Sequence, residues 1–355
     1  MRIALVGPYH PATGGVQIYM TYLARELISM GHEVIAISYA DAEPQAGEEV
    51  RRAPRVPVPG LRGVTFIAYS TYSLIKVKPD VALTHYALTS GQAGFLASLL
   101  GGRYTVTFHG SDLRISRRLS KLVASRASAV VAVSNWIAEK LRKMGIRADR
   151  VIPGGVDGSL FSSLPSREEI RREMGLEGKV VLSVGALTEA KGFDLIPDIA
   201  ALVNRELEAT FLIVGEGPLA PKIEKRASSL GVRDKVRLLG RRSFEETVKL
   251  YRAADLLLHP ARHEGYGLVA LESLAAGTPV VAADVEGLRD VVMDGVDGFL
   301  TPRSAEAMAK KVLILLRDEN LREEMAKRGR ERALKRTWNR VAQEYLELIE
   351  EVFRE

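Results

Sequence analysis

Short apolar runs alternate with amphipathic stretches along most of this chain, and the alternation restricts the possible folds more than any other feature of the sequence. In the first part of the chain the apolar runs predict buried strands, because they are short and bounded by Gly, Pro and polar residues. The expected strands are residues 2–7, 33–38, 56–57, 81–84, 104–108, 129–133 and 151–152. Strands that alternate with helices predict a parallel sheet with helices on both faces.

Helical periodicity between these runs predicts helices near residues 15–30, 65–77, 90–100, 115–125 and 135–145. In the first helix, we expect the positions that face the sheet to be Ile18, Tyr22, Ala24, Leu27 and Ile28.

The alternation stops at Pro153 and begins again after a segment rich in Ser and Pro that ends at Ser166. The strands expected after this linker are residues 179–184, 210–214, 235–239, 256–259, 279–282 and 298–300, and the last helices are 305–316, 320–335 and 338–353. The sequence therefore predicts an α/β protein with two doubly wound domains, residues 1–157 and 158–337. Ligands of such folds bind at the carboxyl ends of the strands.

The composition supports two cores and excludes several kinds of site. The chain has 355 residues, 46% of them hydrophobic, which is enough for two domains. It has no Cys, which excludes disulfides, thiolate metal sites and a Cys nucleophile. Few Asn and Gln beside 26% charged residues fit a heat-adapted source. The first apolar run is too short for a signal peptide or a membrane span, so we expect a cytoplasmic protein.

The net charge of +6 arises from the first 155 residues, because the remainder carries a small acidic excess. Basic side chains cluster at Arg114, Arg117, Arg118 and Lys121, and again at Lys140, Arg142 and Lys143. The simplest interpretation is a solvated helix face. The alternative is peripheral contact with the anionic inner face of a membrane. No nucleic-acid-binding motif accompanies the charge, so we expect no nucleic-acid partner.

The stretch from His259 to Ala283 contains the strongest candidate site. An apolar strand ends at His259, a loop follows, and a helix is expected to begin near Gly267 and to end at Gly277. The first amides of a helix have no internal partner and carry the positive end of its dipole. We therefore expect residues 267–269 to bind an anion such as a phosphate.

Two glutamates flank this anion site. Glu264 precedes the helix and Glu272 lies about one turn inside it, and helical side chains lean toward the N-terminus. Carboxylates beside an anion site are explained if they accept hydrogen bonds from hydroxyl groups on either side of a diphosphate. A nucleotide sugar has this form. The spacing alone is weak evidence, because two glutamates eight residues apart are common.

The wider stretch resembles the signature of family 4 of the retaining glycosyltransferases, in which two glutamates are separated by seven residues. The matching positions are Glu264, Gly265, Gly267, Glu272, Gly277, Pro279, Val280, Val281 and Ala282. The resemblance covers essentially the whole chain. It implies the GT-B fold, in which two Rossmann-like domains face a deep cleft and the last helix, about 338–355, crosses back to the first domain. It also implies that the first domain binds the acceptor and the second the nucleotide sugar.

The resemblance assigns roles to residues on both domains. Glu264 would hold hexose hydroxyls, Glu272 the ribose, and Lys191 the diphosphate, while His109 and Gly15 would close over the sugar. The expected catalytic residues are His109, Lys191 and Glu264. The expected donor-binding residues are Gly14, Gly15, Asp112, Arg241, Gly265, Tyr266, Gly267, Leu268, Val269 and Glu272.

One position departs from the family pattern, which reads G-R-L, three residues, K-G. Lys191 and Gly192 match, but Ala186 stands where the family has a phosphate-binding arginine. Arg262, Arg241 and Arg114 are the candidates to replace this cation. The alternative is that this chain has changed its donor or lost its activity.

The resemblance implies transfer of a hexosyl group from a UDP- or GDP-sugar to a hydroxyl of a sugar or lipid-linked acceptor, with retention at the anomeric carbon. No Asp-x-Asp motif is present, so we expect neither a metal nor another cofactor. Two alternatives remain open: an epimerase or hydrolase of nucleotide sugars, and a binding protein without activity. The oligomeric state has no signal in the sequence.

Overall fold

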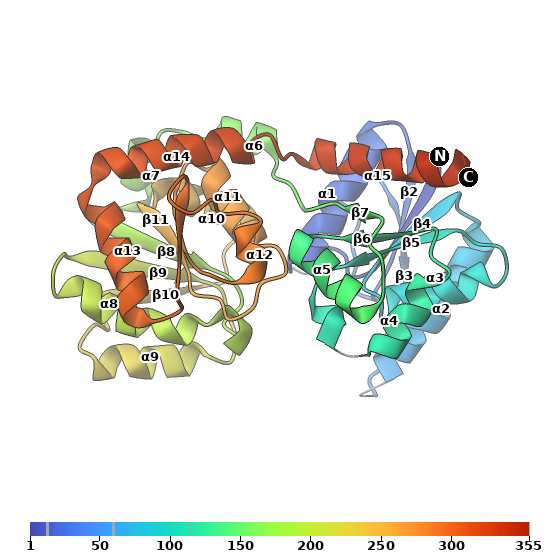
Figure 1. The fold of residues 1–355 in the computed structure, drawn as a ribbon, viewed down its shortest axis with the longest axis horizontal. Helices are drawn as coiled ribbons and strands as arrows, with labels where there is room; N and C mark the ends of the chain where they lie inside the picture. Colours follow the sequence, from blue (N-terminus) through green and yellow to red (C-terminus); the bar gives the residue numbers. More distant parts are fainter. Residues whose placement is uncertain (12–13, 59–60, 115, 355) are drawn as a thin grey trace. The chain divides into compact units, whose positions relative to one another are not determined.

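The structure, a computed structural model, describes residues 1–11, 14–58, 61–114 and 116–354 and divides into two units (Figure 1). The first unit comprises Met1–Gly155 and Trp338–Glu355, and the second comprises Val156–Thr337. This division falls two residues before the boundary expected from the sequence.

The first unit is built on a seven-stranded parallel sheet with the order β3-β2-β1-β4-β5-β6-β7. Its strands are β1 (Arg2–Val6), β2 (Glu33–Ser38), β3 (Glu49–Arg52), β4 (Val81–His85), β5 (Tyr104–Phe108), β6 (Ala129–Ala132) and β7 (Arg150–Val151). The strand order reverses between β1 and β4. Doubly wound sheets bind their ligands at this reversal, where the loops after the two strands diverge.

Helices cover this sheet, and the last helix of the chain is one of them. They are α1 (Gly15–Ser29), α2 (Leu61–Val77), α3 (Ser90–Ser98), the short 3-10 helix η1 (Ser111–Arg114), α4 (Arg117–Ala124), α5 (Asn135–Met144) and α15 (Trp338–Arg354). Figure 1 shows α15 beside α1, and the Trp338 and Tyr22 rings stack with centroids 5.4 Å apart. The expected start of α4 at Ile115 lies outside the described residues.

The strand expected at residues 56–57 is wrong. The chain instead forms β3 at Glu49–Arg52, on the edge of the sheet. The Glu48 carboxylate orders the approach to β3, because it accepts hydrogen bonds from the Tyr9 hydroxyl and from the Gln45 and Ala46 amides. Pro57 lacks the amide hydrogen that a strand must donate, so pairing at residues 56–57 is disfavoured.

The expected buried face of α1 is also partly wrong. The buried side chains are Val16, Tyr19, Met20, Leu23, Ala24 and Leu27, whereas Ile18, Tyr22 and Ile28 are only half-buried. The difference has a physical cause, because α1 packs against α15 as well as against the sheet. Tyr22 serves the helix contact through its stacking on Trp338.

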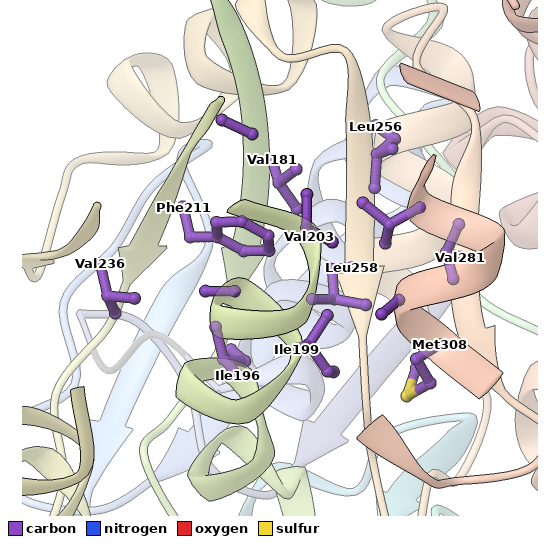
Figure 2. Close-up of a cluster of buried hydrophobic side chains, with 14 of the residues drawn as sticks. Val181, Ile196, Ile199, Val203, Phe211, Val236, Leu256, Leu258, Val281 and Met308 are labelled. Carbon is purple, nitrogen blue, oxygen red and sulfur yellow. The ribbon is translucent and has the colours of Figure 1, made fainter. Parts of the chain in front are cut away.

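The second unit is built on a six-stranded parallel sheet with the order β10-β9-β8-β11-β12-β13. Its strands are β8 (Lys179–Val184), β9 (Ala209–Val214), β10 (Val236–Gly240), β11 (Leu256–His259), β12 (Val280–Ala283) and β13 (Gly298–Thr301). Figure 2 shows the core on one face, where strand residues such as Phe211 and Leu258 meet Ile199 and Met308 from two helices. Here the strand order reverses between β8 and β11.

The helices of the second unit begin within the expected linker. They are α6 (Gly158–Ser162), α7 (Arg167–Met174), η2 (Glu189–Lys191), η3 (Phe193–Leu195), α8 (Ile196–Asn204), α9 (Ala220–Ser229), α10 (Phe244–Ala253), α11 (Leu268–Ala275), α12 (Glu286–Arg289), α13 (Ala305–Arg317) and α14 (Glu319–Ala333). Capping boxes at Ser166 and Ser243 fix the starts of α7 and α10. In each box the serine hydroxyl accepts a hydrogen bond from the backbone amide of a glutamate three residues later, and the carboxylate of that glutamate accepts one from the serine amide. The predicted parallel sheets with intervening helices are confirmed in both units.

Candidate active site

A carboxylate that is largely shielded from solvent, Glu264, lies at the reversal of the second sheet. It follows β11, and its side chain is 13% exposed. Its Oε2 lies 2.6 Å from Lys191 Nζ and 3.0 Å from His259 Nε2, while its Oε1 accepts from the Gly265 amide at 3.1 Å. Burial alone would raise the pKa of Glu264, but the charge of Lys191 and the bond from His259 outweigh it and hold the pKa well below its usual range. Glu264 is therefore ionised.

The loop that carries Lys191 is fastened to the loop that carries Glu264. The Ala190 carbonyl accepts from the amides of Arg262 and His263 at 2.9 and 3.2 Å. Arg303 donates from Nε to the Pro260 carbonyl at 2.8 Å and from Nη2 to the Gly192 carbonyl at 3.1 Å. These bonds position the Lys191 ammonium and the Glu264 carboxylate relative to one another.

Gly192 is required for this contact between loops. Its φ is +66°, and a Cβ built on it would lie 2.2 Å from the Pro260 carbonyl oxygen. Only glycine adopts such a left-handed conformation without cost and leaves room for the approaching backbone.

The N-terminus of α11 lies directly after the Glu264 loop. Gly267 precedes the helix with a φ of +104°. The first amides that donate within the helix are those of Ala270 and Leu271, both to the Gly267 carbonyl. The amides of Leu268 and Val269 therefore precede the internal hydrogen bonds of the helix and carry the positive end of its dipole. The preceding Tyr266 is buried.

The second glutamate has different surroundings. Glu272 is 6% exposed, and its Oε2 accepts from the Tyr251 hydroxyl at 3.0 Å. Burial raises the pKa of Glu272 to about 7, and the bond from Tyr251 only partly opposes this effect. The two carboxylates thus have opposite tendencies near neutral pH, since Glu264 is held ionised and Glu272 is near its midpoint.

A group of cations surrounds one further carboxylate next to Gly192. Asp194 lies 2.8 Å from the Arg262 guanidinium, 3.5 Å from that of Arg303 and 3.7 Å from Lys222 Nζ. Three cations that share one carboxylate leave an excess of positive charge beside the Lys191 loop. Ala186, on the same loop, is exposed.

Arg241 follows β10, and its backbone amide donates to Glu216 Oε1 at 3.4 Å. The loop after β9 is pressed against the loop after β8, because a Cβ on Gly215 would lie 1.9 Å from the Gly185 carbonyl oxygen. Arg241 therefore lies on the second unit beside these loops, while its predicted contact with the base stays a prediction.

In the first unit, His109 lies one strand away from the reversal of the sheet. His109 follows β5, and its Nε2 lies 2.9 Å from Nδ1 of His85, the last residue of β4. Asp112 is buried and accepts from the amides of Gly110 at 2.9 Å and Ala87 at 3.3 Å. Burial raises the pKa of Asp112 to about 6. These contacts hold the loops after β4 and β5 together, and the donor contact expected of Asp112 stays a prediction.

Gly14 and Gly15 lie at the N-terminus of α1, where the Gly14 carbonyl accepts from the Ile18 amide at 3.0 Å. Part of the basic cluster of the first unit is paired within its own helix. Arg142 and Lys143 pair with Glu139 at 2.8 and 3.4 Å, as expected of a solvated helix face. The side chain of Arg114 lies outside the described part of the chain.

The sequence did not single out four residues of these sites: His85, Tyr251, His259 and Arg303. His85 and His259 carried a usable signal, since each is a polar residue that ends an apolar strand. Tyr251 and Arg303 lie in elements that are distant in sequence from the carboxylate or loop that they contact. Local patterns do not encode such contacts.

Two family models match this chain. Residues 13–160 match "Glycosyltransferase Family 4" and residues 166–332 match "Glycosyl transferases group 1". D-inositol 3-phosphate glycosyltransferase of Corynebacterium glutamicum is 32% identical over 95% of this chain and 94% of its own length. The chain is a family 4 glycosyltransferase.

This glycosyltransferase resembles further proteins along its whole length. Phosphatidyl-myo-inositol mannosyltransferase of Mycolicibacterium smegmatis is 29% identical over 99% of the chain and 94% of its own length. Sucrose-phosphate synthase from Thermosynechococcus elongatus superimposes with a TM-score of 0.86 at 24% identity, over 99% of both chains. Anabaena HepE, in complex with UDP and glucose, gives 0.83 at 22% identity, also over 99% of both chains. The fold is GT-B, as predicted.

Within the described residues, no helix of this glycosyltransferase has the length and hydropathy needed to cross a membrane.

Proposed function

We propose that this glycosyltransferase moves a hexosyl group from a UDP- or GDP-sugar to an acceptor hydroxyl, with retention at the anomeric carbon and without a metal ion. The observation that carries the proposal is the pairing of Lys191 with Glu264, 2.6 Å apart, directly before the first amides of α11. A cation and helix amides suit a diphosphate, and a carboxylate suits the hydroxyl groups of a hexose.

Donor binding exchanges the partners of Lys191. In the unliganded site the Lys191 ammonium neutralises the Glu264 carboxylate. A diphosphate carries more negative charge than this carboxylate and competes with it for the ammonium. Once Lys191 turns to the diphosphate, Glu264 accepts hydrogen bonds from hexose hydroxyls, while His259 keeps the carboxylate in place. The Glu272 carboxylate accepts hydrogen bonds from the ribose hydroxyls, and the amides of Leu268 and Val269 donate to phosphate oxygens.

Lys191 also acts in the chemical step. Negative charge grows on the diphosphate as the bond to the anomeric carbon breaks, and a fixed cation stabilises that charge more in the transition state than in the ground state. The acceptor hydroxyl attacks from the face that the diphosphate leaves, which gives retention, and its proton passes to the departing diphosphate oxygen. His109 and Gly15 of the first unit contact the hexose.

Arg262 supplies the second cation that Ala186 cannot. Its backbone is fixed to Ala190, beside Lys191, and its guanidinium is 44% exposed. Asp194 holds this guanidinium together with Arg303 and Lys222, so a diphosphate that draws Arg262 away leaves Asp194 with two cations. Of the other two candidate cations, Arg241 lies on the same unit but follows β10, and Arg114 belongs to the first unit.

The acceptor binds to the first unit, where two cavities of about 420 Å³ each share Tyr39, Asp41 and Arg62. One of them reaches Tyr86, whose ring lies 5.3 Å from that of His109. The Asp41 carboxylate can accept hydrogen bonds from hydroxyl groups of an acceptor, and the Arg62 guanidinium can pair with an anionic group. The relatives named for inositol phosphate and phosphatidyl-inositol support an acceptor with both hydroxyl groups and a phosphate. HepE, solved with UDP-glucose, supports a UDP-sugar as donor.

The test is transfer of labelled hexose from UDP-glucose, UDP-N-acetylglucosamine or GDP-mannose to a panel of polyol phosphates, sugars and lipid-linked sugars. The proposal predicts acceptor-dependent release of nucleotide diphosphate in excess EDTA, and a product in which the anomeric configuration of the donor is kept. Free sugar or an epimer from donor alone would favour a hydrolase or an epimerase. An inverted product would contradict the retaining mechanism.

A further inference from the structure

Two histidines of the first unit touch through their ring nitrogens. His85 ends β4 and His109 follows the neighbouring parallel strand β5. Nδ1 of His85 lies 2.9 Å from Nε2 of His109. Both rings are neutral, because burial lowers the pKa of His85 to about 3 and is the main cause that lowers the pKa of His109 well below its usual range. Of two neutral rings in such a contact, one must donate and the other accept.

Burial of His85 distinguishes the two arrangements. His85 is 0% exposed, and its Nε2 has no hydrogen-bond partner in the described part of the chain. If His109 donated from Nε2, the proton of His85 would lie on its own Nε2 and would be a buried N–H without an acceptor. Buried N–H groups without a partner are rarer in native proteins than buried acceptors without one.

His85 Nε2 makes no hydrogen bond to the aromatic residues that pack around its ring in the described part of the chain. The rings of Tyr19 and Tyr345 lie 5.4 and 6.4 Å from the His85 ring. The Tyr19 hydroxyl donates to the Ile152 carbonyl at 2.9 Å, and the Tyr345 hydroxyl bonds Thr107 Oγ1 at 2.8 Å. The two hydroxyl groups also bond one another at 3.3 Å, and together these bonds hold the aromatic packing around His85 in place.

We infer that His85 donates from Nδ1 to Nε2 of His109 and thereby fixes His109 in the tautomer that carries its proton on Nδ1. The edge of the His109 ring turned away from His85 then presents a hydrogen-bond donor. This consequence rests on the proposed function: His109 donates to a hydroxyl oxygen of the hexose and does not act as a general base. His85 is a positioning residue, because it acts on the sugar only through His109.

The tautomer can be observed directly in the unliganded wild-type protein. The chain has only six histidines, so long-range ¹H–¹⁵N correlations of histidine-labelled protein are tractable, and the His109→Gln variant assigns the His109 signals. The inference predicts a protonated Nδ1 and an unprotonated Nε2 for His109 at neutral pH, with a protonated Nδ1 for His85. A protonated Nε2 on His109 would overturn it. No nucleotide is present, so the outcome does not depend on the proposed function.

Two variants test the consequence for catalysis. His85→Asn keeps an N–H close to the position of Nδ1, whereas His85→Leu removes the donor at similar size. With UDP-glucose or GDP-mannose, whichever the wild type consumes, His85→Asn should stay within about threefold of wild-type kcat/KM, and His85→Leu should lose about tenfold or more, the value of one hydrogen bond. Equal losses in both variants, or no loss in His85→Leu, would contradict the positioning role.

The tautomer and the positioning role can still be tested if His85→Leu does not fold, because the wild-type spectrum and the activity of His85→Asn are measured on other proteins. A wild type that consumes no nucleotide sugar contradicts the proposed function and leaves the tautomer result intact.

Discussion

Glu272 lies in surroundings that disfavour its charged form, and the proposed contact with ribose requires that form. Burial raises the pKa of its carboxyl to about 7 in the unliganded protein. An ionised carboxylate accepts two hydroxyl hydrogen bonds better than a protonated one, so donor binding lowers this pKa. Binding therefore expels a proton below pH 7, and donor affinity rises as the pH rises to about 7 and is constant above it.

We expect the Kd of UDP-glucose to fall about tenfold between pH 6 and pH 8, by linkage to a single group with a pKa near 7. Titration calorimetry at three pH values measures this. A nucleotide sugar is the correct ligand, because the terminal phosphate of free UDP itself titrates near pH 6. The Glu272→Gln variant should bind more weakly, with little pH dependence. A wild type with a flat profile would contradict the role of Glu272.

The same pKa predicts how Glu272 affects stability. The folded pKa of about 7 lies above the usual value of 4.5, so folding becomes less favourable as the pH rises from about 4.5 to about 7. Glu272→Gln should therefore stabilise the protein at pH 8, by at most about 3 kcal/mol, and should have little effect at pH 4.5. Chemical denaturation at the two pH values tests this. Equal effects at both would show that burial does not disfavour the charge.

At the scale of elements, the contact between the loop after β8 and the loop after β11 positions the proposed diphosphate site. Gly192 makes it possible, since a Cβ would lie 2.2 Å from the Pro260 carbonyl oxygen. Gly175 is a matched control, because its φ of +62° is similar and nothing lies within 4 Å of its Cβ position. Both substitutions by Ala impose left-handed strain, but only Gly192→Ala also forces the loops apart.

We expect Gly175→Ala to lose about 1 kcal/mol of unfolding free energy and to keep its affinity for the nucleotide sugar. Gly192→Ala should lose about 3 kcal/mol or more and should bind the nucleotide sugar at least tenfold more weakly. Denaturation and calorimetry on the two variants measure these changes. Similar behaviour of both would mean that contact between the loops does not determine the site.

The strands were largely predictable because both sheets are parallel, and buried parallel strands are continuous apolar runs. β3 was missed since its sequence, Glu49–Arg52, is polar and lies on a sheet edge. The face of α1 was misjudged because α15 covers part of it, and local periodicity contains no information about a helix at the other end of the chain. Likewise, the family signature indicated Glu264 and Lys191, but only the fold brings Arg303 and Tyr251 to their partners.

At the scale of the whole molecule, the last helix belongs to the first unit although the second unit precedes it in sequence. Tyr345 of α15 bonds Thr107 of β5, and Trp338 stacks on Tyr22 of α1. A protein that ends at Thr337 would expose these buried partners. We expect its first unit to become protease-sensitive, while residues 156–337 persist as a resistant fragment. Limited proteolysis with mass spectrometry measures this, and equal resistance of both units would contradict it.

The central claim is that Lys191 binds the diphosphate of a nucleotide sugar. It is tested most directly by thermal shift with UDP, GDP and ADP and their glucose, mannose and N-acetylglucosamine conjugates. Lys249→Ala is the matched control, because Lys249 is also paired with a glutamate, Glu173, at 2.7 Å. If Lys191 binds the diphosphate, nucleotides of one base will stabilise the wild type and Lys249→Ala equally, and Lys191→Ala much less. No shift at millimolar nucleotide, or an equal shift in Lys191→Ala, would contradict it.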